Sequence, residues 1–187
     1  MQAILKDKIN LAKKLSFLKL WNLSLLYISF YVSRILKKPI QWGLPTSISF
    51  EPTTSCNLRC PECPSGLRAF TRKTGMLTPE FFEQTILQLK PTLHYLTFYF
   101  QGEPYLNPNF LDMVKFASNH GIYTATSTNG HYLKDEVAKK TIESGLDRLI
   151  ISIDGTTQET YEQYRIGGNL EKVIDGFNGK SECRKNR

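Results

Sequence analysis

Cysteine is scarce in this chain, and the few cysteines present are unevenly placed. Three of the four lie within eight residues, at Cys56, Cys60 and Cys63, and the fourth is Cys183. Small secreted domains that depend on disulfides are much denser in cysteine, and the sequence shows no cleavable signal-peptide pattern. We therefore expect a cytoplasmic protein whose thiols remain reduced and free to bind a metal.

The sequence also lacks an apolar run of the about 20 residues that a membrane-spanning helix needs. The apolar run at residues 20–33 is fourteen residues long and is followed by Arg34. At helical spacing its polar positions fall on one stripe, formed by Lys19, Asn22, Ser29, Ser33 and Lys37. This pattern predicts an amphipathic helix with a wide apolar face.

Acidic residues are almost missing from the first forty positions. Residues 1–40 contain eight Lys and Arg against Asp7 alone, which accounts for the whole formal charge of +7. Basic and aromatic residues on an amphipathic helix suit an anionic membrane surface, here the inner one. The alternative is a helix that packs across the following domain or on a partner. The remaining residues carry no net charge, and we expect no nucleic acid partner.

The three clustered cysteines have the spacing C-x3-C-x2-C. Soft thiolate ligands favour iron–sulfur clusters, zinc or copper(I). Three protein ligands leave one position of a metal centre open for a water, a substrate or a cofactor. Pro61 and Pro64 each follow a cysteine and stiffen the loop. A zinc knuckle, or a disulfide with one free thiol, remains as the alternative on spacing alone.

Strand-like and helix-like segments alternate after the cysteine region begins. The predicted strands are residues 47–51, 94–100, 122–126 and 148–153, and helices follow at about 79–90, 109–119, 133–143, 158–164 and 170–177. This order predicts a parallel sheet with right-handed crossovers. Unusual residues follow every strand, so four loops are expected to converge at the carboxyl edge of the sheet, where β/α barrels build their active sites.

These loops carry a family resemblance. The cysteine motif follows the first strand, Gly102-Glu103-Pro104 the second, residues 127–130 (STNG) the third and residues 152–155 (SIDG) the fourth. In this order they resemble the radical SAM enzymes over residues 46–177. The segment at 164–177 also resembles the subgroup that carries a C-terminal SPASM extension.

The resemblance implies a partial (β/α)6 barrel in which Cys56, Cys60 and Cys63 hold a 4Fe-4S cluster. S-adenosylmethionine would occupy the open iron, and an electron from a donor such as flavodoxin or ferredoxin would cleave it. The resulting 5'-deoxyadenosyl radical would abstract hydrogen from a peptide or a small-molecule substrate. No residue of the chain is assigned as catalytic, because the cofactors perform the chemistry.

The resemblance also implies contacts to S-adenosylmethionine. Gly102, Glu103 and Pro104 would face the methionine ammonium group. Ser127 and Asn129 would bond the ribose or the carboxylate, Ser152 and Asp154 would lie near the ribose hydroxyls, and Arg165 would pair with the carboxylate. Asn-Gly turns and a capping aspartate are the structural alternatives for these loops.

Some features depart from the family pattern. Glu62 stands where an aromatic residue is frequent, and Gln101 replaces the first glycine of Gly-Gly-Glu-Pro. Only four of six β/α units are present, which predicts a truncated enzyme with three parts: a basic helical segment at 1–40, the partial core at 46–177 and a polar tail at 178–187. The alternative function is a non-catalytic iron–sulfur or zinc protein docked to a membrane or partner.

Four further side chains that can bind metals are not assigned to a metal site. His94, His120 and His131 have no mutual spacing that suits a ligand set, and Cys183 is interpreted as a lone thiol.

Overall fold

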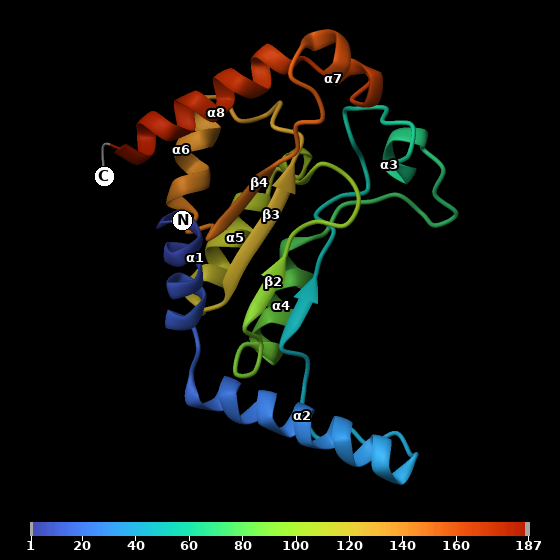
Figure 1. Ribbon diagram of the computed structural model, residues 1–187, viewed down its shortest axis with the longest axis vertical. Helices are drawn as coiled ribbons and strands as arrows, with labels where there is room; N and C mark the ends of the chain where they lie inside the picture. The colour runs from blue at the N-terminus through green and yellow to red at the C-terminus, as the bar shows by residue number, and fades with distance from the viewer. Residues whose placement is uncertain (1, 186–187) are drawn as a thin grey trace.

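A four-stranded parallel sheet forms the centre of the computed structural model (Figure 1). The model describes residues 2–185, with side chains described for residues 4–178. The strands are β1 (Ser47–Ser49), β2 (Tyr95–Thr97), β3 (Tyr123–Thr128) and β4 (Arg148–Ile151), in the order β1-β2-β3-β4. The predicted α/β class and parallel sheet are thereby confirmed.

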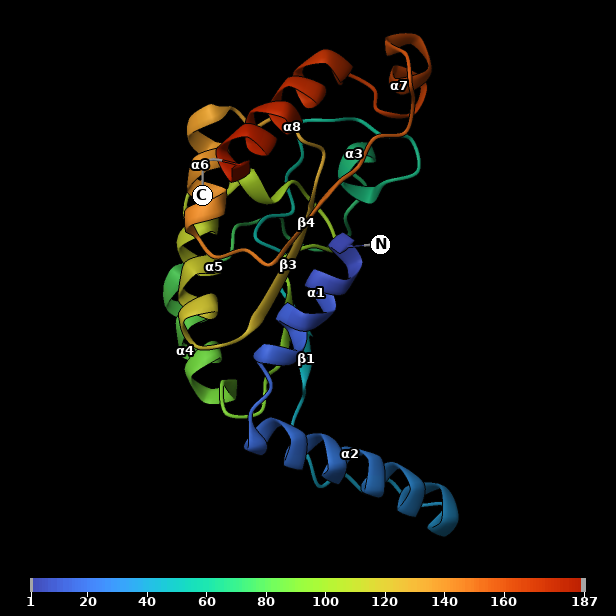
Figure 2. The ribbon, with the colours of Figure 1, turned by 60° about the vertical axis from the view of Figure 1, so that its left-hand side comes forward.

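Three helices cover one face of this sheet (Figure 2). They are α4 (Pro79–Leu89), α5 (Phe110–Asn119) and α6 (Asp135–Glu143). Thr78 caps α4 by accepting a hydrogen bond from the Phe81 N–H, and Pro79 takes the first helical position, as the sequence predicts. The main core between this layer and the sheet is fully buried and includes Phe82, Ile86, Leu96, Phe98, Phe110 and Val114.

The opposite face of the sheet carries the alternate side chains of each strand. Tyr95 and Tyr123, which are register partners, stack there with ring centroids 5.1 Å apart. Helix α1 (Gln2–Lys13) lies over the lower end of this face (Figure 2). Asp7 of α1 accepts hydrogen bonds from the Tyr123 hydroxyl and from Arg148, so α1 is attached by polar contacts.

The helical segment predicted at residues 1–40 consists of two helices. Ser16 caps the second, α2 (Phe17–Leu36), by accepting from the Lys19 N–H at 3.3 Å. The two helices meet at an angle of 96°. Helix α2 projects across the end of the molecule where the strands begin (Figure 1).

The C-terminal part of the chain closes the other end. Helices α7 (Gln158–Tyr164) and α8 (Leu170–Lys185) follow β4, and Tyr161, Leu170 and Val173 form a second buried cluster against Ile151. Helix α8 packs against α6 and runs through most of the segment predicted as a polar tail. Two short helices, α3 (Pro64–Leu67) and the 3-10 helix η1 (Pro104–Leu106), lie in the loops after β1 and β2.

Candidate functional site

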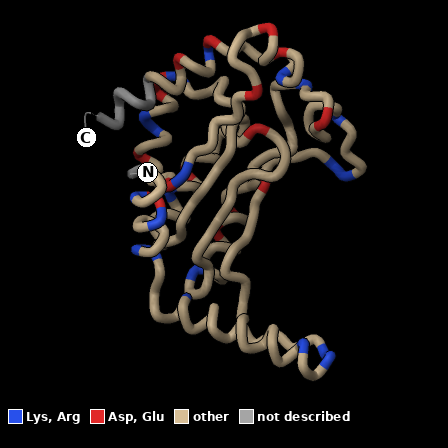
Figure 3. Tube along the Cα trace, viewed as in Figure 1, with Lys and Arg blue, Asp and Glu red and all other residues tan. Residues whose placement is uncertain are grey.

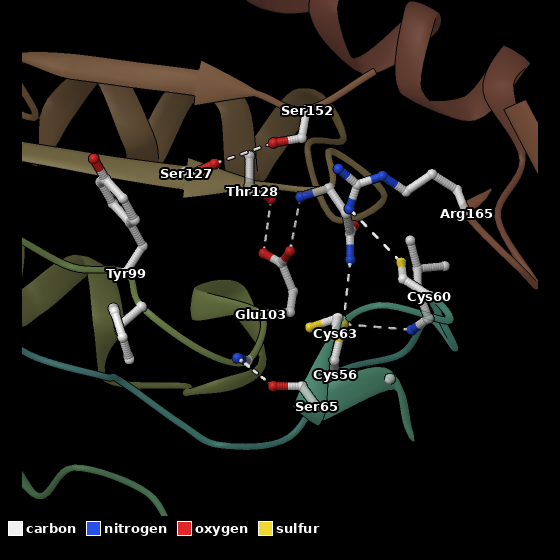
Figure 4. Close-up of a pocket in the computed structure, with 15 residues that line it drawn as sticks. Cys56, Cys60, Cys63, Ser65, Tyr99, Glu103, Ser127, Thr128, Ser152 and Arg165 are labelled. Atoms are coloured by element: carbon white, nitrogen blue, oxygen red, sulfur yellow. Dashed lines mark hydrogen bonds between the residues drawn. The ribbon is translucent and has the colours of Figure 1, made fainter. Parts of the chain in front are cut away.

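The loops after all four strands meet in one pocket of about 140 Å3 at the carboxyl edge of the sheet (Figure 4). Nine of the eleven residues predicted from the sequence line it: Cys56, Cys60, Cys63, Gly102, Glu103, Ser127, Asn129, Ser152 and Arg165. Pro104 and Asp154 do not line it. Pro104 begins η1, and Asp154 is the ion-pair partner of Arg165.

All three clustered cysteines are free thiols. Cys60 is 4% exposed, and Cys56 and Cys63 are half-buried. Helix α3 begins directly after Cys63, and a Cβ on its Gly66 would lie 2.5 Å from the Cys60 backbone, so only glycine allows this close approach. Within the described side chains, no group of three His, Cys, Asp or Glu is arranged around a single metal ion. The thiols instead line a shared pocket, which suits a larger inorganic group better than one tetrahedral zinc.

Burial and a nearby cation act on two of the three thiols. Burial raises the pKa of the Cys56 thiol and of the Cys60 thiol, and Arg165 acts in the opposite direction on Cys60, whose Sγ lies 3.8 Å from the Arg165 Nη1. Metal binding requires the thiolate form and releases these protons. The donor set therefore fits a metal centre, with Arg165 as the nearby cation.

The loop after β2 is attached directly to the cysteine loop. Gln101, which departs from the family pattern, accepts hydrogen bonds from Ser65 at 3.0 Å and from Cys63 at 3.5 Å. The Gly102 N–H donates to Ser65 Oγ at 2.8 Å, and the Glu103 N–H donates to the Ser55 carbonyl at 2.8 Å. The departure at Gln101 thus supplies a contact that holds the two loops together.

Glu103 connects the second and third loops from inside the pocket wall (Figure 4). Its side chain is 2% exposed, and its carboxylate accepts from Thr128 Oγ1 at 2.7 Å, the Asn129 N–H at 2.9 Å and the Tyr105 N–H at 3.3 Å. Burial raises the pKa of the Glu103 carboxyl, and these hydrogen bonds oppose the rise. The predicted contact of Glu103 with a ligand ammonium stays a prediction.

Thr128 is a site residue that the sequence reasoning did not single out. It is the last residue of β3, which extends two residues beyond the predicted strand at 122–126. It lies between the predicted Ser127 and Asn129, lines the pocket and donates a hydrogen bond to Glu103. Its position inside the STNG motif was the available signal.

Asn129 joins the third loop to the cysteine loop. Its Nδ2 donates to Asn57 Oδ1 at 2.7 Å and lies 3.8 Å from Cys56 Sγ. Its Oδ1 accepts from the His131 N–H at 3.1 Å, while His131 Nε2 accepts from the Asn169 N–H at 2.8 Å. His131 is accordingly a turn residue that supports the site from behind.

The fourth strand contributes Ser152, whose hydroxyl lies 3.2 Å from that of Ser127, so two hydroxyls face the pocket side by side. Arg165 binds Asp154 through Nε and reaches Cys60 through Nη1. Its predicted role as a ligand-carboxylate partner stays a prediction. His94 and His120 lie at the ends of the strands remote from the pocket, and the side chain of Cys183 lies outside those described.

Parallel β/α units with a thiol-lined pocket at the carboxyl edge define a β/α-barrel-type cofactor protein. The chain belongs to the radical SAM superfamily, whose family model matches residues 50–179. Members of this superfamily bind a 4Fe-4S cluster and S-adenosylmethionine, and their known activities are enzymatic.

Several curated proteins are similar in sequence. The chain is 29% identical to the AdoMet-dependent heme synthase of Methanosarcina barkeri over 134 residues, which are 71% of this chain and 38% of the relative. It is 34% identical to the GTP 3',8-cyclase of Limosilactobacillus fermentum over 128 residues, 67% of this chain and 38% of the relative. Identity to the mycofactocin maturase MftC of Mycobacterium ulcerans is 29% over 130 residues, 70% of this chain and 35% of the relative.

The chain therefore spans little more than a third of the length of these relatives. Among solved structures, native anSMEcpe with bound AdoMet superposes with a TM-score of 0.63 at 22% identity, covering 75% of this chain and 42% of that one. SuiB of Streptococcus suis bound to precursor peptide SuiA gives a TM-score of 0.61 at 17% identity, covering 75% and 31%. These likenesses confirm the fold, a portion of the radical SAM barrel.

Proposed function

We propose that this chain binds a 4Fe-4S cluster through Cys56, Cys60 and Cys63 and binds S-adenosylmethionine in the adjoining pocket. One observation carries the proposal: three free thiols and the motif-bearing loops of four β/α units line the same pocket. Three thiolates leave one iron open, which suits a cofactor that supplies its own ligands. When bound, this pair of cofactors supplies a 5'-deoxyadenosyl radical for hydrogen abstraction.

The protein's residues position and enclose the cofactors. Glu103 holds the third loop in place, and the hydroxyls of Ser127 and Ser152 are available as hydrogen-bond partners for the ribose. Gly102 has a positive φ of 78° and keeps the second loop close to the cysteine loop. These contacts supply orientation rather than chemistry.

The substrate is proposed only as a chemical class. The similar proteins include a heme synthase, a GTP cyclase and a maturase, and one similar structure holds a precursor peptide. We propose a peptide or a small molecule as the substrate class. Radical SAM enzymes generally take electrons from flavodoxin or ferredoxin, and we propose such a donor here.

We propose as a second function a non-catalytic protein that holds an iron–sulfur cluster. The three free thiols all lie in the loop after β1, so this loop alone supplies the protein ligands of such a cluster.

Anaerobic reconstitution with iron and sulfide separates these functions. We expect a chain with the broad brown absorption of a 4Fe-4S cluster that converts S-adenosylmethionine into 5'-deoxyadenosine and methionine after chemical reduction. A cluster without 5'-deoxyadenosine supports the non-catalytic function. Cys60→Ala should lose most of the bound iron and Cys183→Ala should retain it; equal loss in both would contradict the ligand assignment.

A further inference from the structure

Helix α2 is oriented with its apolar residues toward solvent. Many of its large aromatic and aliphatic side chains are more than half exposed: Phe17 80%, Ile35 78%, Tyr27 61%, Leu18 58%, Trp21 57%, Tyr31 55%, Leu36 55%, Phe30 54% and Ile28 51%. The buried residues of α2 are the polar Lys19, Asn22 and Ser29, which are 5%, 5% and 3% exposed. Surface helices of globular proteins bury the apolar stripe and expose the polar one, so α2 has the reverse orientation.

The polar stripe is held by specific contacts, so this orientation is built into the fold. Asn22 bonds both polar atoms of the Leu44 backbone, donating to its carbonyl at 2.9 Å and accepting from its N–H at 2.8 Å. Ser33 does the same with Ile40, at 2.9 Å in both directions. Lys19 Nζ donates to the carbonyls of Lys14 at 3.0 Å and Gly121 at 2.6 Å.

The charges around this exposed face are of one sign. No Asp or Glu occurs between Asp7 and Glu51. Exposed basic residues flank α2 at both ends, with Lys13 before it and Arg34, Lys37 and Lys38 at its C-terminal end (Figure 3). An apolar face bordered by cations is complementary to the surface of an anionic lipid bilayer.

The helix is suited to lie in a membrane surface rather than to cross it. Among the described helices, none alone is long and apolar enough to cross a bilayer, although α1 and α2 pass such a test together as a pair bent by 96°. Helix α1 is attached to the sheet through Asp7. Lys14, the residue directly after α1, adds an ion pair with Asp147, with 2.6 Å between Nζ and Oδ2. Helix α1 exposes three large aliphatic side chains, Ile4, Leu5 and Ile9, whereas α2 exposes a larger apolar face that includes its aromatic residues.

We propose that the exposed apolar face of α2 docks the protein on an anionic membrane surface, with the helix axis in the plane of the membrane. Lys19 binds α2 to Gly121, which precedes β3. The residues that line the cysteine pocket lie at or beyond the other end of the strands, which is remote from α2 in Figure 1. The six residues of β3 span roughly 20 Å. The pocket therefore lies at the end of the sheet remote from the membrane, where a soluble electron donor or substrate can reach it.

Tryptophan fluorescence of the full chain tests the proposal directly. The sequence contains only two tryptophans, Trp21 and Trp42, which are 57% and 52% exposed, and both lie in or beside α2. Titration with vesicles of phosphatidylcholine and phosphatidylglycerol should shift the emission to the blue and pellet the protein with the vesicles. Binding should weaken at least tenfold without phosphatidylglycerol or at high salt.

Substitutions identify the surface. We expect the combined Phe17→Ser, Ile28→Ser and Ile35→Ser variant to lose binding at least tenfold. The control is the double variant Phe81→Ser and Leu87→Ser on α4. These two apolar side chains are exposed as well, at 58% and 48%, and the variant should bind vesicles like the wild type. The double variant Lys37→Glu and Lys38→Glu reverses two charges at the end of α2. It should weaken vesicle binding more than the double variant Lys139→Glu and Lys172→Glu, which reverses two charges on α6 and α8. Circular dichroism and urea unfolding establish that each variant is folded.

Three outcomes would overturn the proposal. The first is no vesicle binding by the wild type. The second is equal binding of the α2 and α4 variants, or of anionic and neutral vesicles. The third is a concentration-dependent dimer in sedimentation equilibrium that the α2 variant abolishes, because the face would then be an interface between copies of the chain. None of these measurements depends on cofactor binding, so they can fail or succeed independently of the proposed function.

Discussion

At the scale of the residue, Glu103 shows how one buried carboxylate can determine the shape of a pocket. It receives three hydrogen bonds, from Thr128, Asn129 and Tyr105, and so joins the loops after β2 and β3. Asn129 then reaches the cysteine loop through Asn57. Displacement of this carboxylate would therefore be transmitted to the region of Cys56.

Replacing this carboxylate by an amide should loosen the pocket. In Glu103→Gln the new amide NH2 group would face at least one of the three hydrogen-bond donors and could not accept from it. The remaining hydrogen bonds would no longer be made to a charged group. We therefore expect the free energy of unfolding to fall by about 1–3 kcal/mol. Affinity for S-adenosylmethionine should fall about tenfold with the iron content unchanged. Urea unfolding and titration calorimetry measure these effects. The exposed control Glu143→Gln should change neither, and an equal effect of both substitutions would contradict this role.

The identities of most site residues could be predicted from the sequence, but their partners could not. The order of the motifs predicted eight of the residues that line the pocket, because parallel strands bring their carboxyl ends to one edge, and the family resemblance added Arg165. The contacts of Glu103 with Thr128 and of Asp154 with Arg165 depend on side-chain directions that no motif encodes. Gln101 appeared only as a departure, although it bonds Ser65 and Cys63.

At the scale of the element, the alternation of strands and helices was predictable, and the strand lengths were less so. The second strand was predicted at 94–100, whereas β2 is Tyr95–Thr97. Backbone pairing continues beyond it through the Phe98 N–H, which donates to the Ala125 carbonyl. Apolar sequence alone does not distinguish a regular strand from the extended chain that continues it.

The orientation of α2 also could not be predicted, because a helical period gives the faces of a helix but not which face packs on the domain. The same polar stripe is compatible with a helix that lies on a membrane surface and with one that packs on the domain or on a partner. The decisive features are tertiary contacts of Asn22 with Leu44 and of Lys19 with Gly121. The break at Ser16 separates α1 from α2, and its only local signal was a single capping serine.

Removal of the buried lysine should release α2 from the domain. Lys19→Ala would leave the carbonyls of Lys14 and Gly121 without this donor, so the free energy of unfolding should fall by about 1–3 kcal/mol. Hydrogen exchange should increase across α2 and remain unchanged in α5. The exposed Lys38→Ala is the matched control and should behave like the wild type. Unchanged exchange in α2 after the Lys19 substitution would contradict this attachment.

Close approach of the second loop to the cysteine loop depends on Gly102. Its φ is +78°, and an added Cβ would lie 1.9 Å from the Thr53 carbonyl oxygen. Gly102→Ala should therefore lower the free energy of unfolding by about 2 kcal/mol or more and reduce iron incorporation. Gly75→Ala, where nothing lies within 4 Å of the added atom, should cost less than about 0.5 kcal/mol. Equal denaturation midpoints of the two variants would contradict the close-approach argument.

At the scale of the whole molecule, the two ends of the sheet have different surroundings. The carboxyl ends of the strands carry the thiol pocket, and the opposite end carries α2 with the basic residues Arg34, Lys37 and Lys38 at its C-terminal end. The rest of the chain has no net charge. This separation lets docking and cofactor binding proceed on different surfaces, so a change at one should leave the other intact.

The pocket also connects units that are far apart in the sequence, so its cofactors should stabilise the whole fold. Cys60 contacts Arg165 after β4, and Cys63 contacts Gln101 after β2. A ligand that binds only the folded chain at about 100 times its Kd adds about 2.7 kcal/mol. We therefore expect reconstitution, and then S-adenosylmethionine, each to raise the thermal midpoint, and chelation of the iron to reverse both increases. Calorimetry measures the shifts, with Cys60→Ala as the control that should not respond. An increase of equal size in that variant would mean that iron stabilises the chain from somewhere other than the three-thiol loop.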